Sequence, residues 1–431
     1  MKKDKINLIT LGCSKNTVDS ERLLKQLKIN KFQITDDPQK SDTIIINTCG
    51  FIEAAKKESV DTIVNAVNMK KQGLVRRVLV IGCLSERYKK DLEKEIPEVD
   101  NYFGVEKYNE IVESLGGHLK YELLGERHLT APSHYAYLKI SEGCDNPCSF
   151  CAIPIMRGLH KSRPMHELLE EARFLASKGT KELIIIGQDT TDYGKDICGK
   201  RNIAELLNIL STIKGIDWIR LMYAYPSHFP DDLIDEIANN PKVVKYLDIP
   251  LQHISDNVLK SMRRGITKRR TIQLLSDLKN RIPDLVLRTT FIVGYPAETE
   301  SAFSELADFI SSFKFQRLGV FTYSLEEDTP AFPIGDKFSD RIKEKRLNSL
   351  MQIQQSVSRD FNKSLIGSDI KVIVDRLEGD YYICRSFREA PEVDGEILVN
   401  AAENHLKIGN FYYVNVNDAD DYDLFANLKK T

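Results

Sequence analysis

The chain has 431 residues, of which 42% are hydrophobic and 29% are charged, and its formal net charge is −2. These values are typical of a globular protein with room for about three domains, and they do not indicate a basic nucleic-acid scaffold. The apolar runs are strand-sized and no signal-peptide core follows Met1, so we expect a cytoplasmic protein that does not span a membrane. Eight cysteines are too few for a disulfide scaffold, so we expect ligands, catalysts or core residues.

Three segments near the start share one plan, in which an apolar run ends at a cysteine and an amphipathic stretch follows. The segments are residues 6–13, 43–49 and 78–83. This pattern predicts βα units around an open parallel sheet, whose ligand crevice lies at the carboxyl ends of the strands. Cys13, Cys49 and Cys83 all fall at that edge, so we predict that they form a set of three thiolate ligands. For any one of them alone, packing as a small buried residue is the alternative.

From residue 131 onwards, strand-like runs alternate with helical stretches such as residues 165–177, 231–238, 267–281 and 300–313. The strand-like runs are residues 135–140, 182–187, 218–224, 245–250, 286–294 and 317–323. Six such units predict a partial (β/α)6 barrel with its active face at the carboxyl ends of the strands.

A second cysteine set, Cys144, Cys148 and Cys151, follows the first of these strands with the spacing C-x3-C-x2-C. Three thiolates can hold three corners of a four-iron cluster and leave one iron open for chemistry. The alternative is a structural zinc knuckle with His160 or Cys198 as the fourth ligand. The spacing, with an aromatic residue before the third cysteine, resembles the radical S-adenosylmethionine enzymes, which implies that the open iron binds S-adenosylmethionine.

After a charged helical stretch at residues 340–365 the chain becomes rich in short alternating segments, which predict a small antiparallel β-barrel. We therefore divide the chain into residues 1–125, 131–365 and 366–431. The last part has 13 Asp and Glu side chains against 7 Lys and Arg, a formal charge of −6. An acidic barrel suits a basic protein loop better than a nucleic acid. The alternative, with equal weight, is that these acids only solvate the surface.

Two three-cysteine sets on a chain of this organisation resemble the methylthiotransferases, over nearly the whole length. That family combines an N-terminal domain with an auxiliary four-iron cluster, a radical S-adenosylmethionine core and a C-terminal OB-like barrel called TRAM. Three motifs resemble the branch that acts on a ribosomal protein: LGCSKNTVDSE at 11–21, GQDTTDYG at 187–194 and YPSH at 225–228. The transfer-RNA branch typically has Gln-Met-Asn after the first cysteine, whereas Ser-Lys-Asn follows Cys13 here.

The resemblance implies two four-iron clusters and S-adenosylmethionine as cofactors. The cluster on Cys144, Cys148 and Cys151 would generate a 5′-deoxyadenosyl radical that takes a hydrogen from the target carbon. The cluster on Cys13, Cys49 and Cys83 would carry the sulfur of the methylthio group. The implied target is the β-carbon of an aspartate in the twelfth protein of the small ribosomal subunit, and the implied electron donor is a flavodoxin or ferredoxin. The alternatives are a transfer-RNA adenosine methylthiotransferase and a non-catalytic iron–sulfur or zinc interaction module.

The resemblance also implies cofactor contacts, at Phe150, Gly187, Gln188 and Gly294. Gln188 can accept a hydrogen bond only through its amide oxygen, and Gly294 is equally well explained as a turn glycine at a strand end. Weaker candidates are Lys15 and Asp19, which would line the auxiliary site. We interpret His228 and His253 as structural, and Cys198 and Cys384 as non-ligands, because none has matching spacing.

Overall fold

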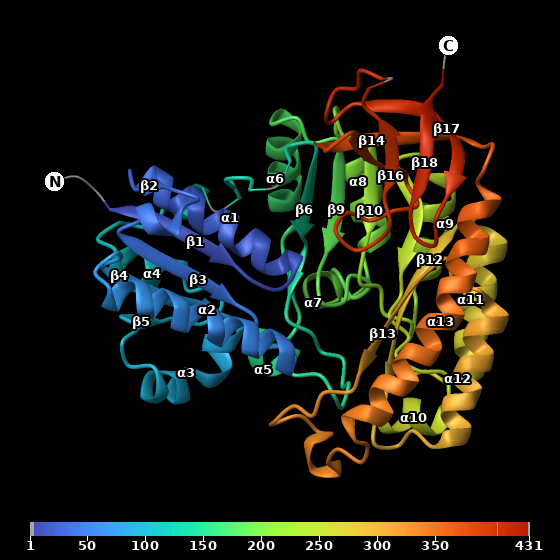
Figure 1. The fold of residues 1–431 in the computed structure, drawn as a ribbon, viewed down its shortest axis with the longest axis horizontal. Helices are drawn as coiled ribbons and strands as arrows, with labels where there is room; N and C mark the ends of the chain where they lie inside the picture. Colours follow the sequence, from blue (N-terminus) through green and yellow to red (C-terminus); the bar gives the residue numbers. More distant parts are fainter. Residues whose placement is uncertain (1–3, 124, 131, 403, 430–431) are drawn as a thin grey trace.

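The computed structural model describes residues 4–123, 125–130, 132–402 and 404–429. They form an open N-terminal sheet, a central six-stranded arc and a closed C-terminal barrel (Figure 1). This arrangement confirms the predicted fold class. No helix within the described ranges is both long and apolar enough to cross a membrane.

The N-terminal sheet is parallel throughout and has the strand order β2-β1-β3-β4-β5. Its strands are β1 (Lys5–Thr10), β2 (Gln33–Ile34), β3 (Thr43–Thr48), β4 (Arg77–Gly82) and β5 (Asn101–Tyr102). Its helices are α1 (Ser14–Ile29), α2 (Glu53–Lys71), α3 (Cys83–Glu95) and α4 (Tyr108–Ser114), with 3-10 turns η1 (Pro38–Lys40) and η2 (Tyr121–Leu123). The three predicted βα units are β1-α1, β3-α2 and β4-α3. The edge strands β2 and β5 were not predicted, because two residues carry no periodic pattern.

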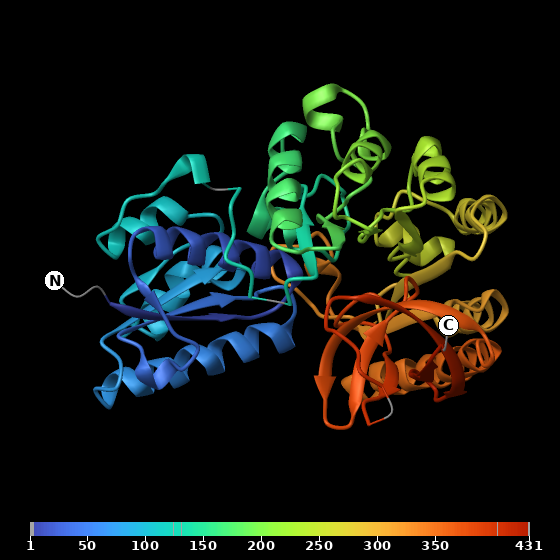
Figure 2. The same ribbon diagram turned by 90° about the horizontal axis from the view of Figure 1, so that it is seen from above.

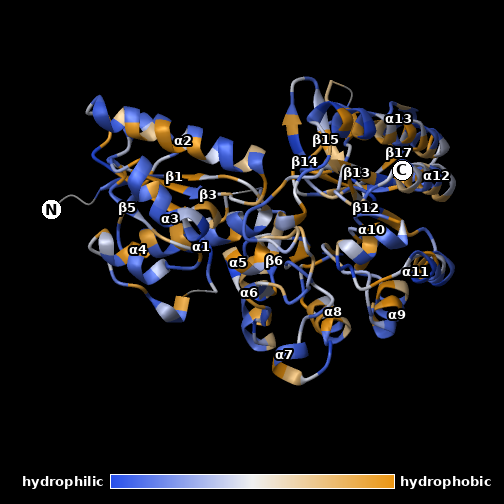
Figure 3. Cartoon of the chain, turned by 90° about the horizontal axis from the view of Figure 1, so that it is seen from below, coloured by the Kyte–Doolittle hydropathy of each residue, from blue (hydrophilic) through white to orange (hydrophobic). Residues whose placement is uncertain are grey.

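Burial explains why β3 forms the centre of this sheet. Ile44, Ile45 and Ile46 are all fully buried, as expected for a parallel strand with helices on both faces. Figure 3 shows β1 and β3 as hydrophobic, while α1 and α2 carry hydrophobic and hydrophilic residues on different sides. The direction of the strand order changes between β1 and β3, and such switch points are where open α/β sheets bind ligands.

The central sheet is also parallel, in the order β13-β12-β11-β10-β9-β6, and confirms the incomplete barrel. Its strands are β6 (Tyr135–Lys139), β9 (Glu182–Ile186), β10 (Trp218–Leu221), β11 (Val243–Asp248), β12 (Val286–Val293) and β13 (Arg317–Thr322). Its helices are α5 (Ile153–Arg157), α6 (Met165–Ser177), α7 (Lys195–Cys198), α8 (Ile203–Ser211), α9 (Asp231–Asn239), α10 (Asp256–Ser261), α11 (Lys268–Arg281) and α12 (Glu300–Phe313), with the 3-10 turn η3 (Phe332–Ile334). A short hairpin of β7 (Ser141–Glu142) and β8 (Lys161–Ser162) brackets the second cysteine loop.

Helix α13 (Asp340–Ser364) leads into the closed barrel, whose order is β14-β15-β16-β18-β17. Its strands are β14 (Asp369–Glu378), β15 (Tyr381–Arg385), β16 (Ile397–Asn400), β17 (Phe411–Ala419) and β18 (Leu424–Leu428). The pairing of β16 with β18 is parallel, whereas the other pairings are antiparallel. The sequence analysis did not predict β18, which closes the barrel.

Residues 385–394 of the C-terminal domain contact three strands of the central arc. Figure 2 shows the C-terminal barrel beside this arc. Arg385 donates to Glu182 on β9 at 2.9 Å, Asp394 accepts from Tyr246 on β11 at 2.7 Å, and Glu389 accepts from Arg317 on β13 at 2.9 Å. The C-terminal domain therefore closes an arc that six strands leave open. Part of its acidic excess lies in this interface, so fewer acids remain at the surface for a basic partner than the composition suggests.

Candidate functional site: two neighbouring cysteine sets

The first cysteine set lies at the switch point of the N-terminal sheet. Thr48 on β3 is in register with Gly82 on β4, so Cys49 and Cys83 follow paired positions. Gly12 has a φ of +87°, and a Cβ built there would lie 2.7 Å from the Cβ of Cys49. The loop that carries Cys13 therefore touches the loop after β3 only because residue 12 is glycine.

Two of these cysteines are at helix N-termini: Cys13 is the N-cap of α1 and Cys83 is the first residue of α3. The partial positive charge at a helix N-terminus favours a thiolate there. Burial opposes ionisation, because it raises the pKa of Cys49 and raises the pKa of Cys83 to about 12. Bound metal ions would stabilise the thiolates, as expected for ligands that lose their protons on metal binding.

The second cysteine set lies in the loop between β7 and α5, and backbone hydrogen bonds hold this loop in place. Cys144 donates its N–H to the carbonyl of Gly158 at 3.1 Å, and Ser149 donates its N–H to Met262 at 3.0 Å. Cys144 and Cys148 are buried and Cys151 is half-buried. Burial raises the pKa of Cys144 to about 11 and that of Cys151 to about 12. These thiols too would need positive ions beside them to ionise at neutral pH.

Hydrogen-bond donors surround the sulfurs of this second set. The Nη1 of Arg264 lies 3.2 Å from the Sγ of Cys148, and the Nδ2 of Asn146 lies 3.4 Å from the Sγ of Cys144. The Arg264 guanidinium also stacks on the Tyr225 ring, 4.3 Å from its centroid. Nothing in the sequence marked Arg264, and Tyr225 was marked only as part of the YPSH motif. The two residues are 116 and 77 positions from Cys148, and no spacing rule links them to it.

The cysteine sulfurs of the described residues are not gathered closely enough to bind one zinc ion together. Three sulfurs at about 2.3 Å from one tetrahedral zinc would lie about 3.8 Å apart. In the described part of the chain, only Asp19, Glu106 and Glu142 bring three potential ligand atoms within 4.8 Å of one another. The Nζ of Lys139 already binds all three carboxylates, at 2.5, 3.0 and 2.6 Å. Neither cysteine set therefore brings three sulfurs within 4.8 Å of one another among the described residues.

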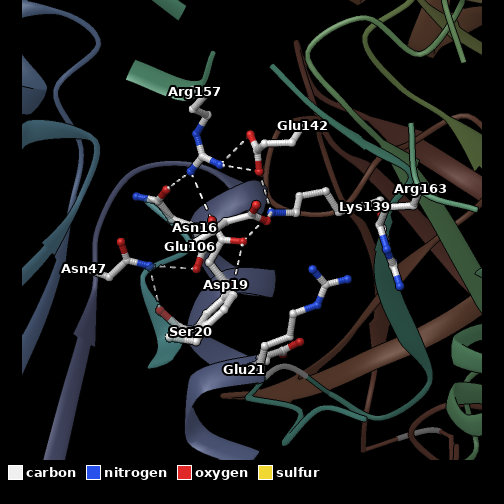
Figure 4. A network of polar contacts seen from close by, with 12 residues as sticks. Asn16, Asp19, Ser20, Glu21, Asn47, Glu106, Lys139, Glu142, Arg157 and Arg163 are labelled. Carbon is white, nitrogen blue, oxygen red and sulfur yellow. Dashed lines mark hydrogen bonds and ion pairs between the residues drawn. The ribbon is translucent and has the colours of Figure 1, made fainter. Parts of the chain in front are cut away.

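A buried polar network joins the two cysteine sets. Figure 4 shows its polar side chains around Arg157, Asp19 and Lys139. Arg157, six residues after Cys151, donates to the Sγ of Cys83 at 3.3 Å, to Asn16 at 2.6 Å and to Glu142 at 2.9 Å. Burial alone would raise the pKa of Asp19, but Lys139 and Arg157 lower it to about 2. The network is therefore ionised at neutral pH, and it fixes the first cysteine set relative to the loop of the second.

Gln188 lies beside this network, and its contact with the cofactor stays a prediction. Its Nε2 donates to Glu142 at 3.2 Å, while its Oε1 is buried and accepts no hydrogen bond from the described residues. This oxygen is the atom through which an ammonium group could be bound. A Cβ on Gly187 would lie 2.7 Å from the Oγ of Ser141, so the neighbouring position has room only for glycine unless Ser141 moves.

The two other predicted cofactor contacts, Phe150 and Gly294, lie close to neighbouring side chains. Phe150 is partly buried against a hydrophobic cluster that includes Met262 and Tyr295. Gly294 has a φ of +76°, and a Cβ there would lie 2.3 Å from the Cγ of Lys343. The approach of Lys343 therefore explains this glycine as a strand-end turn, and contact with a cofactor at Gly294 stays a prediction.

Of the weaker candidates, Lys15 and Asp19 lie near the first cysteine set. The Nζ of Lys15 is 3.0 Å from the centroid of the Tyr223 ring, and Asp19 belongs to the Arg157 network. His253 is fully buried, and its Nδ1 accepts from the N–H of Ser255, which is a structural role. The contacts of the described residues assign no ligand role to Cys198, which is exposed, or to Cys384, which lies inside the C-terminal barrel.

Comparisons with known proteins agree with this geometry. The radical SAM superfamily matches residues 138–310, the uncharacterized protein family UPF0004 matches residues 5–104, and the TRAM domain matches residues 366–428. The radical S-adenosylmethionine methyltransferase TsrM from Kitasatospora setae shares the fold, with a TM-score of 0.57 and 13% identity over 87% of this chain and 79% of that chain. The combination of fold and domains defines a radical S-adenosylmethionine enzyme, a class that uses a four-iron cluster and S-adenosylmethionine.

Relatives that match nearly the full length of the chain show which family within this class it belongs to. The ribosomal protein uS12 methylthiotransferase RimO of Flavobacterium johnsoniae is 50% identical over 99% of this chain and 98% of its own. That of Chloroherpeton thalassium is 50% identical over 99% of each chain. The chain belongs to the RimO family of radical S-adenosylmethionine methylthiotransferases.

Proposed function

We propose that this chain transfers a methylthio group to the β-carbon of an aspartate in ribosomal protein uS12. The relatives that carry the uS12 methylthiotransferase name match nearly every residue of the chain, which supports this choice of substrate. The main structural support for this chemistry is that Arg157, just after the second cysteine set, contacts the sulfur of Cys83 in the first. An enzyme that both opens a C–H bond and inserts sulfur needs two cofactor sites side by side.

Cys144, Cys148 and Cys151 would hold one four-iron cluster, and Cys13, Cys49 and Cys83 would hold the second. The first would supply the electron for radical cleavage of S-adenosylmethionine, and the second would supply the sulfur. The chain itself orients these groups. The free Oε1 of Gln188 would accept from the amino group of S-adenosylmethionine, while Arg157 and Asn16 hold the loops of the two cysteine sets together.

The second candidate function is a transfer-RNA adenosine methylthiotransferase. The experiment incubates the reconstituted enzyme separately with uS12 and with transfer RNA, and measures the methylthio mass increment on each. We expect the increment on an aspartate of uS12 only. An increment on the RNA alone would refute the proposed substrate.

The division of labour between the cysteine sets is tested separately. We expect Cys148→Ala to abolish reductive cleavage of S-adenosylmethionine, and Cys49→Ala to retain cleavage and lose sulfur insertion. Cys198→Ala is the matched control, because Cys198 is exposed and belongs to neither set. Equal cleavage activity in Cys148→Ala and Cys49→Ala would contradict the proposed roles.

A further inference from the structure

A strongly basic surface segment lies over the second cysteine set. Residues 260–270 contain six Lys and Arg and no Asp or Glu, in a chain whose net charge is −2. Lys260, Arg263, Arg269 and Arg270 are exposed, and none forms an ion pair with another residue within the described ranges. They occupy the end of α10, the following turn and the start of α11.

The turn that carries the exposed Arg263 contacts the loop of the second cysteine set directly. Met262 accepts the N–H of Ser149 at 3.0 Å, inside the cysteine loop. Arg264, adjacent to the exposed Arg263, is buried and donates to the Sγ of Cys148 at 3.2 Å. The outer face of the turn is therefore a short path from the surface to Cys148.

The folding of α11 does not explain the cations at its start. The first turn of α11 holds Lys268, Arg269 and Arg270 and no acidic residue. Cations near a helix N-terminus are destabilising, because they face the positive end of the helix dipole. Lys268 is paired with Glu305 at 2.7 Å, whereas the two arginines project to solvent.

A hollow of about 850 Å³ lies beside the same segment. Lys260, Arg263 and Arg270 line it, together with three aspartates. Two of these acids are already engaged, since Asp231 pairs with Arg281 and Asp256 accepts from the backbone N–H of Lys268. The hollow carries as many aspartates as Lys and Arg, so the basic character belongs to residues 260–270 beside it. That segment can attract an acidic protein by electrostatic complementarity.

We propose that the surface formed by Lys260, Arg263, Arg269 and Arg270 is the docking site of the electron donor, a small acidic electron-transfer protein with a reduced flavin or iron–sulfur centre. This proposal rests on the proposed function, because an electron donor would dock here only if Cys148 helps to hold a cluster that accepts electrons. In each transfer the donor loses one electron and the cluster gains it, and no covalent bond changes. The same cations would attract RNA, but their position over Cys148 favours the electron donor.

The test uses the double variant Arg269→Glu/Arg270→Glu of the cluster-loaded full chain. Acidic residues suit the first turn of a helix, so the variant should fold at least as well as the wild type. We expect its Kd for a recombinant acidic flavodoxin, measured by titration at low salt, to rise about tenfold. Cleavage of S-adenosylmethionine driven by limiting flavodoxin should fall by a similar factor, while cleavage driven by dithionite should be unchanged.

The matched control is Arg173→Glu/Lys214→Glu, which makes the same charge change at two exposed residues near the opposite ends of the strands. It should bind flavodoxin like the wild type. Equal loss of binding in both double variants would overturn the proposal. The proposal would also be overturned if Arg269→Glu/Arg270→Glu kept flavodoxin-driven cleavage and lost only modification of ribosome-bound uS12. That result would assign the surface to RNA binding. A wild-type enzyme without dithionite-driven cleavage would refute the proposed function instead.

Discussion

Glu171 on α6 is the centre of a buried charge cluster that ties the N-terminal domain to the central arc. Its carboxylate is fully buried and lies 3.1 Å from Arg22 of α1, 3.0 Å from Arg127 and 2.6 Å from Arg163. Burial alone would raise the pKa of Glu171, but Arg163, Arg22 and Arg127 lower it to about 2 from 4.5. We expect the substitution Glu171→Gln, which keeps the shape and removes the charge, to destabilise the fold.

Two arguments give the size of the expected loss of unfolding free energy in Glu171→Gln. A pKa lowered from 4.5 to about 2 corresponds to about 3 kcal/mol of stability at neutral pH. Removing one partner of a buried ion pair typically costs about 3–5 kcal/mol, because the opposite charges stay buried. Since the folded pKa is lowered, the contribution is present above pH 4.5 and is lost as the pH falls towards 2. The difference in unfolding free energy between wild type and variant should therefore narrow by about 1 kcal/mol between pH 7 and pH 4.

The assay is urea unfolding of both proteins, combined with amide hydrogen exchange at residues 126–130. A local loss of about 3 kcal/mol predicts exchange about a hundredfold faster in that segment. Glu170→Gln is the matched control, because Glu170 is the exposed neighbour on the same helix, and its effect should stay within about 0.5 kcal/mol. If Glu171→Gln were no less stable than Glu170→Gln at pH 7, the reasoning about the buried cluster would be wrong.

Three further outcomes are expected. Gly12→Ala should place a methyl group against Cys49 and lower the iron content from about eight towards about four atoms per chain. Iron and sulfide analysis measures this content, and an unchanged value would contradict the role of Gly12. Arg264→Gln should make the reduction potential of the cluster on the second cysteine set more negative, because a cation beside Cys148 is lost. Spectroscopic redox titration measures this potential, and a value equal to that of the wild type would refute the prediction. Arg385→Met should destabilise by about 3–5 kcal/mol in urea unfolding, because Asp375 is left with His134 alone and Glu182 with Arg220 alone. The surface control Arg376→Met should cost less than about 1 kcal/mol, and equal losses would refute the interface argument.

The strands and the placement of the cysteines could be predicted from the sequence because both are local features. Runs such as Ile44–Ile46 are apolar on both faces, and Cys49 and Cys83 directly follow such runs, so their position at the sheet edge follows from the strand ends. The spacing of Cys144, Cys148 and Cys151 is itself a short-range pattern. Each of these signals lies within about ten residues of chain.

The groups that surround the cysteines could not be predicted, because their partners are far away along the chain. Arg157 contacts the sulfur of Cys83 across 74 residues, and Arg264 contacts that of Cys148 across 116. An arginine in such a contact looks like any surface arginine in the sequence. The closure of the arc by residues 385–394 was missed for the same reason, since acids that pair with Arg317 and Arg385 read as solvating charges until the domains are placed together.

The charges between the two cysteine sets serve geometry more than stability. The N-terminal sheet meets the central arc through Arg157 with Asp19, Lys139 with Asp19, and Glu171 with Arg22. Apolar side chains of the same volume would often stabilise such an interface equally well or better. Buried ion pairs and hydrogen bonds, however, act only at defined distances and angles, whereas apolar contacts tolerate sliding. The proposed transfer of sulfur from one cysteine set to a substrate held at the other requires a constant separation, and these pairs supply it.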